Sequence, residues 1–214
     1  MRIDLHCHSK YSLDNYFEPE QLIKQALKMN LDGVCFTEHY SLEASMPVTE
    51  INVPKGFSVF RGLEISTDKG HLLVYGLKDD SWNTWSMNNY PDARAVIEKV
   101  RQMGGVCAPA HPFRPCDSFG DELLRINSFD AVETHNGRDS PGMNRKALET
   151  SRILGLPSIG GSDCHNKKQV GRAYTLFNNP VYTIEALVDE IRKGNCQGKI
   201  LERNMNNYRF SESL

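Results

Sequence analysis

The chain has 214 residues, of which 39% are hydrophobic and 24% are charged, and its net charge is −2 at pH 7. This length and composition predict a single globular domain over residues 1–214. The charge lacks the basic footprint of nucleic-acid binding, which makes a long nucleic acid an unexpected partner. No apolar stretch approaches the roughly 18 residues of a membrane span, and no secretory signal opens the chain. We therefore expect a cytoplasmic protein that makes no membrane contact.

Short apolar strands alternate with amphipathic helical segments along the chain. This alternation predicts an α/β fold with parallel strands and crossover helices, and with functional groups at the carboxyl ends of the strands, as in barrel enzymes. The polar segments 40–56 and 82–90 are predicted to be loops over the barrel mouth. The barrel is expected to cover about residues 1–195, and the polar tail 199–214 receives no role. The strands are predicted over 3–5, 34–36, 59–65, 72–77, 106–109, 131–134, 158–161 and 174–177, and the helices over 19–29, 91–103, 141–154 and 183–193.

Histidines and carboxylates recur at the ends of the apolar runs. His6 and His8 form an H-x-H pair after the first run, and strand alternation directs both imidazoles to the same side. Asp163 and His165 repeat this spacing near the end of the chain. Glu64 lies inside an apolar strand, where a charge is costly unless a cation or another partner compensates it. A bridging role between two metal ions would suit Glu64.

The remaining candidates occur singly: Asp14 after the H-x-H pair, His39 and His111 after strands, and His71 before a strand. Each has a structural explanation on its own, such as a turn aspartate or a core histidine. Independent structural histidines would not be expected at the same end of so many strands. Imidazole and carboxylate are ligands for borderline divalent metals, so the whole set predicts a polynuclear metal site.

Six cysteines are dispersed along the chain without a C-x-x-C pair. A disulfide framework is not expected, because a domain of this length does not need one and the sequence shows no secretion signal. Cys7 and Cys164 each lie between two candidate ligands, and alternation directs their side chains to the opposite face. We interpret them as reduced, buried side chains rather than as metal ligands.

Taken in order, these motifs resemble those of the PHP (polymerase and histidinol phosphatase) family. The similarity runs from residue 3 to about residue 176, and the opening H-x-H with the late Gly-Ser-Asp-x-His is specific. The resemblance implies a distorted (β/α)7 TIM-like barrel, up to three divalent metal ions and phosphoester hydrolysis. Glu38 stands where Asp commonly precedes the histidine, and its side chain is expected to point away from the site. The motifs that carry the resemblance are His6-x-His8 with Ser12 and Asp14, Glu38-His39, Gly-x-Glu64, His71, Ala-His111-Pro and Gly-Ser-Asp163-x-His165.

Transferred residue by residue, the resemblance implies three metal positions. His6, His8, Glu64 and Asp163 would bind the first ion; Glu64, His71 and His111 the second; and Asp14, His39 and His165 the third. Some family members have histidine in place of Asp14, and an oxygen ligand there favours manganese or iron somewhat over zinc.

Three further residues are candidates for catalysis or substrate contact. Arg114 and Arg138 follow candidate strand ends, and arginine can hold a phosphate through two parallel donors. The alternative for each is a solvated surface charge. His135 is the histidine outside the ligand set; it could donate a proton to the leaving group, contact substrate or support the site. Glu133 and Asn136 are further candidates for supporting the site.

The leading hypothesis is a metal-dependent phosphoesterase in which a metal-activated hydroxide hydrolyses a small phosphorylated metabolite. The substrate would be a phosphomonoester such as histidinol phosphate or a nucleotide, and phosphate or sulfate is expected to bind at the site. A phosphodiesterase acting on short nucleic-acid ends or cyclic phosphates is an alternative. A metal-dependent amidohydrolase and a non-catalytic metal-binding module are two others. The sequence leaves the exact substrate, the native metal and the oligomeric state open.

Overall fold

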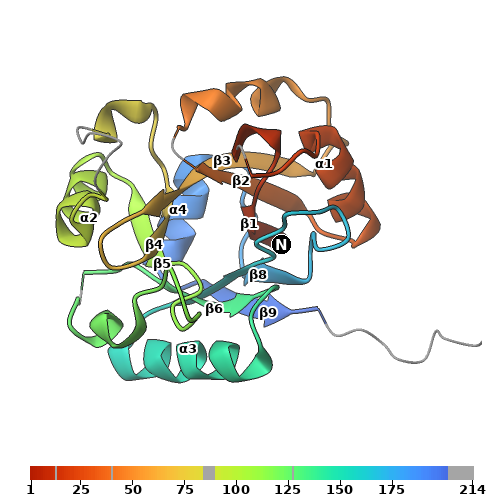
Figure 1. Cartoon of the computed structure of the whole chain (residues 1–214). Coiled ribbons are helices and arrows are strands. Elements are labelled where there is room, and N and C mark those ends of the chain that lie inside the picture. The colour runs from red at the N-terminus through yellow and green to blue at the C-terminus, as the bar shows by residue number, and fades with distance from the viewer. Residues whose placement is uncertain (13, 40, 84–89, 127, 202–214) are drawn as a thin grey trace, which may run out of the picture.

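The computed structural model describes residues 1–12, 14–39, 41–83, 90–126 and 128–201. Helices surround a strongly curved sheet (Figure 1). The strands are β1 (Arg2–Cys7), β2 (Gly33–His39), β3 (Ser58–Ser66), β4 (His71–Tyr75), β5 (Val106–Pro109), β6 (Val132–Asn136), β7 (Ser158–Gly161), β8 (Ala173–Phe177) and β9 (Cys196–Ile200). The α-helices are α1 (Pro19–Lys28), α2 (Ala93–Gln102), α3 (Pro141–Leu154) and α4 (Ile184–Arg192).

Seven strands form one sheet in the order β5-β4-β3-β2-β1-β8-β9, and β6 pairs with β7 in a second sheet. The strands β1, β2 and β3 are parallel, as the sequence predicts. Three strands depart from this prediction. β4 is antiparallel to β3, β8 is antiparallel to β1, and β9 is antiparallel to β8. Only residues 67–70 separate β3 from β4, too few for a crossover helix, so these two strands form a hairpin.

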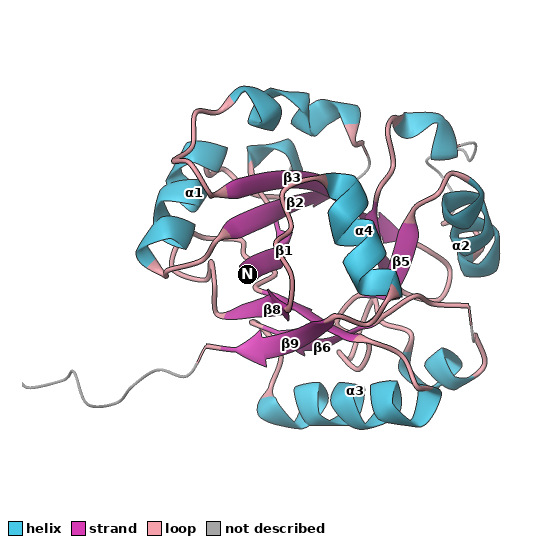
Figure 2. Cartoon of the chain, turned by 180° about the vertical axis from the view of Figure 1, so that it is seen from behind, coloured by secondary structure: helices cyan, strands magenta, loops and turns pink. Residues whose placement is uncertain are grey.

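The strand β7 brings the two sheets together into a distorted barrel. It packs beside β1, β8 and β9, and the N–H of Asp163 donates to the carbonyl oxygen of His6 at 2.7 Å. The helix α4 lies in front of the strands when the molecule is seen from behind (Figure 2). Its Leu187, Val188 and Ile191 share a buried cluster with Val106 and Phe177, at the opposite strand ends from the histidines. The fold is the mixed α/β, TIM-like barrel that the sequence predicts.

The helix termini follow the local signals in the sequence. Pro141 begins α3, and the Ser140 hydroxyl accepts the N–H of Met143 as an N-terminal cap. Gly155 ends the helix at φ +66°, in the left-handed region that favours glycine. The Asp92 carboxylate caps α2 in the same way, by accepting the N–H of Ala95. These local interactions fix where each crossover begins and ends.

Two predictions about irregular segments are modified. The segment 41–56 contains a 3-10 helix, Glu43–Glu50. The first residues of the predicted tail belong to β9, which forms by pairing with β8, about 20 residues earlier in the chain, and not through a local pattern. Residues 40, 84–89 and 202–214, which belong to the predicted loops and tail, lie outside the described residues. Among the helices that the structure describes, none combines the length and apolarity that crossing a bilayer requires.

Candidate metal centre

One rim of the barrel carries the predicted ligands. Parallel strands deliver them at or just beyond their carboxyl ends, whereas His71 stands at the amino end of β4. Because β4 is antiparallel to β3, its amino end lies at the same rim, and His71 pairs in register with Ser66. The prediction of parallel strands is therefore wrong for β4, but His71 still lies at the rim where the other candidate ligands are. The residues gathered at this rim are His6, His8, Asp14, His39, Glu64, His71, His111, Asp163 and His165.

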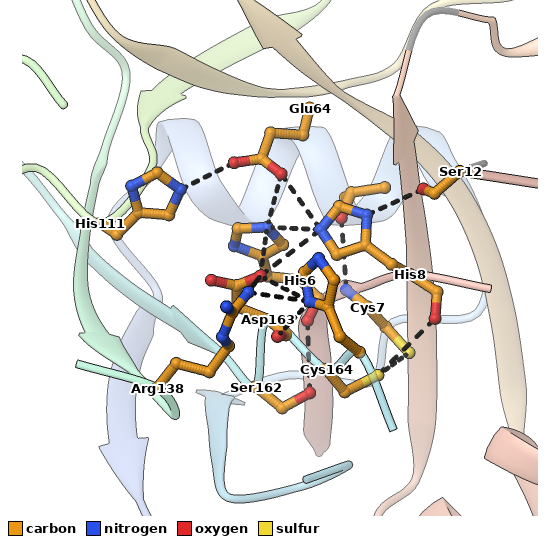
Figure 3. A network of polar contacts seen from close by, with 12 residues as sticks. His6, Cys7, His8, Ser12, Glu64, His111, Arg138, Ser162, Asp163 and Cys164 are labelled. Carbon is orange, nitrogen blue, oxygen red and sulfur yellow. Dashed lines mark hydrogen bonds and ion pairs between the residues drawn. The ribbon is translucent and has the colours of Figure 1, made fainter. Parts of the chain in front are cut away.

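The most buried group comprises His6, His8, Glu64 and Asp163 (Figure 3). The Nε2 atoms of His6 and His8 lie 3.0 Å apart, and each is 3.1 Å from Oε2 of Glu64. Asp163 Oδ1 is 3.7 Å from Nε2 of His6 and 3.6 Å from Nε2 of His8. The four side chains are at most 2% exposed. The H-x-H pair therefore points both imidazoles at one small volume, as strand alternation predicts.

The second group shares Glu64. Its Oε1 atom lies 2.9 Å from Nδ1 of His71 and 2.8 Å from Nε2 of His111. Each carboxylate oxygen of Glu64 thus faces a different set of imidazoles, and this is the geometry that a bridging ligand requires. Figure 3 shows this carboxylate between His111 on one side and the H-x-H pair on the other.

The third group is the most exposed. Asp14 Oδ2 lies 2.8 Å from Nε2 of His165 and 3.5 Å from Nε2 of His39. The ligand atoms of His8, Asp14 and His39 lie within 4.8 Å of one another, and His165 adjoins this group through Asp14. The side chains of Asp14 and His165 are 43% and 25% exposed, which makes this the open side of the centre.

Neighbouring charges in the cluster shift one another's pKa values. Burial alone would lower the pKa of His6, but the carboxylates of Glu133, Glu64 and Asp163 hold that pKa well above its usual value. Burial dominates at His8 and lowers its pKa. Burial would raise the pKa values of Glu64 and Asp163, but the neighbouring imidazoles outweigh it and keep both well below the usual range. The centre therefore favours ionised carboxylates beside ring nitrogens.

The donor set fits divalent metal ions. Imidazole nitrogens and carboxylate oxygens converge in groups, each with its ligand atoms within 4.8 Å of one another. In addition, Nδ1 of His111 is buried without a hydrogen-bond partner, although Nε2 of the same ring faces Glu64. Cys7 and Cys164 lie outside these groups, in an apolar cluster with Leu22 of α1, and all six cysteines are free thiols.

Two of the ligands have backbone conformations that the sequence did not predict. His111 has φ +29° and Asp163 has φ +51°, both in the left-handed region that non-glycine residues seldom adopt. The N–H of His111 donates to Glu133 Oε2 at 2.6 Å, and the N–H of Asp163 donates to His6. Gly161 allows this approach, because a Cβ there would overlap the backbone of His6.

The two candidate arginines have different surroundings. Arg114 donates to Asp163 at 2.7 Å, to Asp139 at 2.9 Å and to Asn136 at 3.1 Å, and its side chain is 21% exposed. Arg138 lies 3.3 Å from Asp163 Oδ1, and its side chain is 38% exposed. Both arginines thus contact proposed ligands, because Arg138 also lies 2.9 Å from Nδ1 of His165, but Arg138 is the more exposed of the two. No sequence pattern pointed to Asp139, because its contact with Arg114 forms only in the folded chain.

His135 is not brought to the cluster. Its Nδ1 lies 2.7 Å from the hydroxyl of Thr134, and the ring faces Gly198 of β9. It lines a cavity of about 950 Å³ between α3 and β9, together with Leu148 and Arg172, and Asn136 and Asp139 line the same cavity. Burial and the nearby Lys199 lower the pKa of His135. The shift in register between β6 and β7 near His135 removes the simple alternation that would have aimed it at the rim.

Comparison with known proteins agrees with this geometry. The family described as PHP domain matches residues 4–109, and the one described as PHP-associated matches residues 141–196. The chain belongs to the PHP family. It is a metal-dependent phosphoesterase of that family, with a cluster of His, Glu and Asp residues able to hold metal.

Two relatives are similar to this chain in sequence. An uncharacterized protein of Methanocaldococcus jannaschii is 28% identical over 168 residues, which cover 73% of this chain and 94% of that protein. A probable histidinol-phosphatase of Thermotoga maritima is 35% identical over 72 residues, 31% of each chain.

Two solved structures share the fold. A Bacteroides vulgatus two-domain protein with a predicted PHP-like metal-dependent phosphoesterase has a TM-score of 0.69 at 16% identity, over 94% of this chain and 64% of that one. The lesion-specific endonuclease Q of Pyrococcus furiosus has a TM-score of 0.68 at 19% identity, over 92% of this chain and 57% of that one.

Proposed function

We propose that this protein hydrolyses the phosphomonoester of a small metabolite, such as histidinol phosphate or a nucleotide, with up to three manganese, iron or zinc ions. The observation that carries the proposal is the position of Glu64, whose two oxygens face two separate sets of imidazoles. Asp14, His39 and His165 provide the ligands for a third ion on the open side. The site residues of the proposal are the nine predicted ligands.

Bound divalent ions would supply Lewis acidity toward phosphoryl oxygens and lower the pKa of a water molecule. The chain's own residues orient the substrate. Arg138 lies beside Asp163 and His165 on the open side, where its half-exposed guanidinium can donate to a phosphate. Arg114 donates to the carboxylates of both Asp163 and Asp139, so we assign it to orienting a ligand and not to contacting the substrate. The position of His135 gives no support to its role as proton donor.

A phosphodiesterase that acts on nucleic-acid ends is the second candidate. The similarity of fold to endonuclease Q supports it, and so does the exposure of the Asp14 side of the centre. The net charge of −2 favours the small substrate over a long nucleic acid. An amidohydrolase has less support, because the carboxylate of Glu64 occupies the place of the carboxylated lysine on which that class often relies.

The proposal is tested with a panel of phosphomonoesters, cyclic phosphates, dinucleotides and abasic duplex DNA. The protein is first treated with a chelator, and manganese, iron or zinc is then added back. We expect turnover of phosphomonoesters that depends on the added metal and is absent from His8→Ala and Asp163→Ala proteins that remain folded. Preferential cleavage of the DNA would support the second candidate, and full activity in either variant would rule out the site.

A further inference from the structure

Two buried glutamates that are not in the ligand groups are linked to the H-x-H pair from different strands, Glu133 directly and Glu38 through Ser12. Glu38 of β2 and Glu133 of β6 are 0% and 1% exposed. Neither belongs to the groups of side chains that could hold a metal. Each one nevertheless connects to a histidine of the pair through the ring nitrogen, Nδ1, that faces away from the cluster.

Glu38 acts on His8 through Ser12. The Ser12 hydroxyl donates to Oε2 of Glu38 at 2.5 Å, and a carboxylate can only accept. The hydroxyl oxygen has two lone pairs, and one of them accepts the backbone N–H of His39 at 3.2 Å. The other faces Nδ1 of His8 at 2.9 Å. Since the hydroxyl proton is already committed to Glu38, Nδ1 of His8 must carry the proton of that hydrogen bond.

Glu133 acts on His6 directly. Its Oε1 lies 2.8 Å from Nδ1 of His6, which must donate to it. Its Oε2 accepts the backbone N–H of His111 at 2.6 Å and the amide of Asn136 at 3.1 Å. Asn136 in turn lies 3.3 Å from Asp163 Oδ2. The Glu133 carboxylate is therefore connected to three candidate ligands. It bonds to the ring of His6 and to the backbone N–H of His111, and it reaches Asp163 through the side-chain amide of Asn136.

From this geometry we infer that Glu38, acting through Ser12, and Glu133 are positioning residues that hold Nδ1 of His8 and of His6 protonated. With Nδ1 of each ring committed in this way, Nε2 is the atom that each ring presents to the cluster. Ser12 also joins the first group to His39 of the third group, and Glu133 joins the first group to His111 of the second. The two glutamates thus also connect ligands that belong to neighbouring groups. This inference rests on the proposed function insofar as the groups bind metal.

The first test needs neither metal nor turnover. Ring ¹⁵N spectra of the metal-free protein distinguish the two neutral forms of histidine. We expect His8 to carry its proton on Nδ1 in the wild type and in Ser12→Thr, and to shift toward the Nε2-protonated form in Ser12→Ala. An unchanged His8 signature in Ser12→Ala would overturn the Ser12 relay, because Nδ1 would then be protonated for another reason.

The second test is a calorimetric titration of each metal-free protein with Mn²⁺. Substituting a group that orients a metal-binding histidine lowers affinity by about 10- to 100-fold. We expect this loss in Ser12→Ala, Glu38→Gln and Glu133→Gln, and recovery in Ser12→Thr. Glu190→Gln is the matched control, since Glu190 is also buried but bonds to Asn179 and Asn195 away from the rim. Its affinity should equal that of the wild type.

The outcomes separate the inference from the proposed function. If the wild type fails to bind Mn²⁺, Fe²⁺ or Zn²⁺, the proposed function fails, and the spectra alone decide the histidine forms. If the wild type binds metal and the Ser12, Glu38 and Glu133 variants bind it equally well, the inference is wrong and the proposed function stands. Far-ultraviolet circular dichroism checks that each variant is folded, and Ser12→Thr against Ser12→Ala remains decisive if a glutamate variant is not.

Discussion

Glu64 Oε1 lies 2.8 Å from Nε2 of His111, although the two residues are 47 positions apart in the chain. The other oxygen of Glu64 faces His6 and His8, so a single buried side chain contacts two groups of candidate ligands. This relationship makes Glu64 the residue whose substitution should have the largest effect on the centre.

Glu64→Gln is expected to remove more than one equivalent of bound metal, because the neutral amide supplies only one weakly donating oxygen to the two groups. Metal ions supply several kcal/mol of transition-state stabilisation, so kcat/KM should fall by about 10²-fold or more. Metal content by mass spectrometry and phosphatase kinetics measure the two effects. A variant that retains the full metal content would show that Glu64 does not bridge.

Arg138→Ala and Arg114→Ala are expected to differ. Loss of Arg138 removes a charge-assisted hydrogen bond to substrate worth about 1.5–3 kcal/mol, so KM should rise by roughly 10- to 100-fold. Metal content should fall less than in Arg114→Ala, because Arg138 contacts Asp163 at the longer distance of 3.3 Å. Loss of Arg114 leaves Asp163 and Asp139 without a shared cation, so metal affinity and the melting temperature should fall. Steady-state kinetics and thermal unfolding on both variants provide the comparison. Equal effects on KM would contradict the division of roles.

Gly161→Ala tests how closely β7 approaches β1. A methyl group at residue 161 would overlap the backbone nitrogen and Cβ of His6, and neither can rotate away. We expect β7 to move outward, with a stability loss of about 1–3 kcal/mol and weakened metal binding. Gly142→Ala is the control, because its Cβ would meet only the Ser140 hydroxyl at 3.8 Å. Urea unfolding of both variants measures the difference, and equal stability would argue against the contact.

Asp80 anchors the segment that follows β2. Burial raises the pKa of Asp80, but hydrogen bonds from Ser41 Oγ and from the N–H groups of Leu42 and Glu43 outweigh burial and lower it. A carboxylate with a lowered folded pKa stabilises the protein above its unfolded pKa of roughly 3.9, and this contribution is lost as the pH falls through the folded pKa.

Asp80→Asn should therefore be less stable than the wild type at pH 7, by about 1 kcal/mol for hydrogen bonds at a partly exposed site. The difference should narrow as the pH falls below about 4, where the wild-type carboxylate begins to be protonated. Chemical unfolding of both proteins between pH 7 and the lowest pH at which they fold measures this. A difference that grows on acidification would contradict the assignment.

The sequence alone predicted the four α-helices and eight of the nine strands that the structure describes, and it placed imidazoles and carboxylates near the ends of those strands. Helix periodicity, Pro141 at a helix start and Gly155 after its end depend on neighbours a few positions away, and the predicted α3 matches the observed one. The spacing of His6 and His8 similarly fixes their common direction, because alternation within a strand is local. The family resemblance then supplied the order of the ligands along the chain.

The tertiary structure decided what depends on distant contacts. The antiparallel direction of β4, the commitment of Arg114 to Asp163 and the removal of His135 from the rim follow from packing between strands far apart in sequence. Asp163 likewise has a left-handed backbone conformation in which its N–H donates to the carbonyl oxygen of His6. The close approach of Gly161 to His6 makes this hydrogen bond possible. Local patterns cannot specify these features, because their energies come from groups that meet only when the barrel closes.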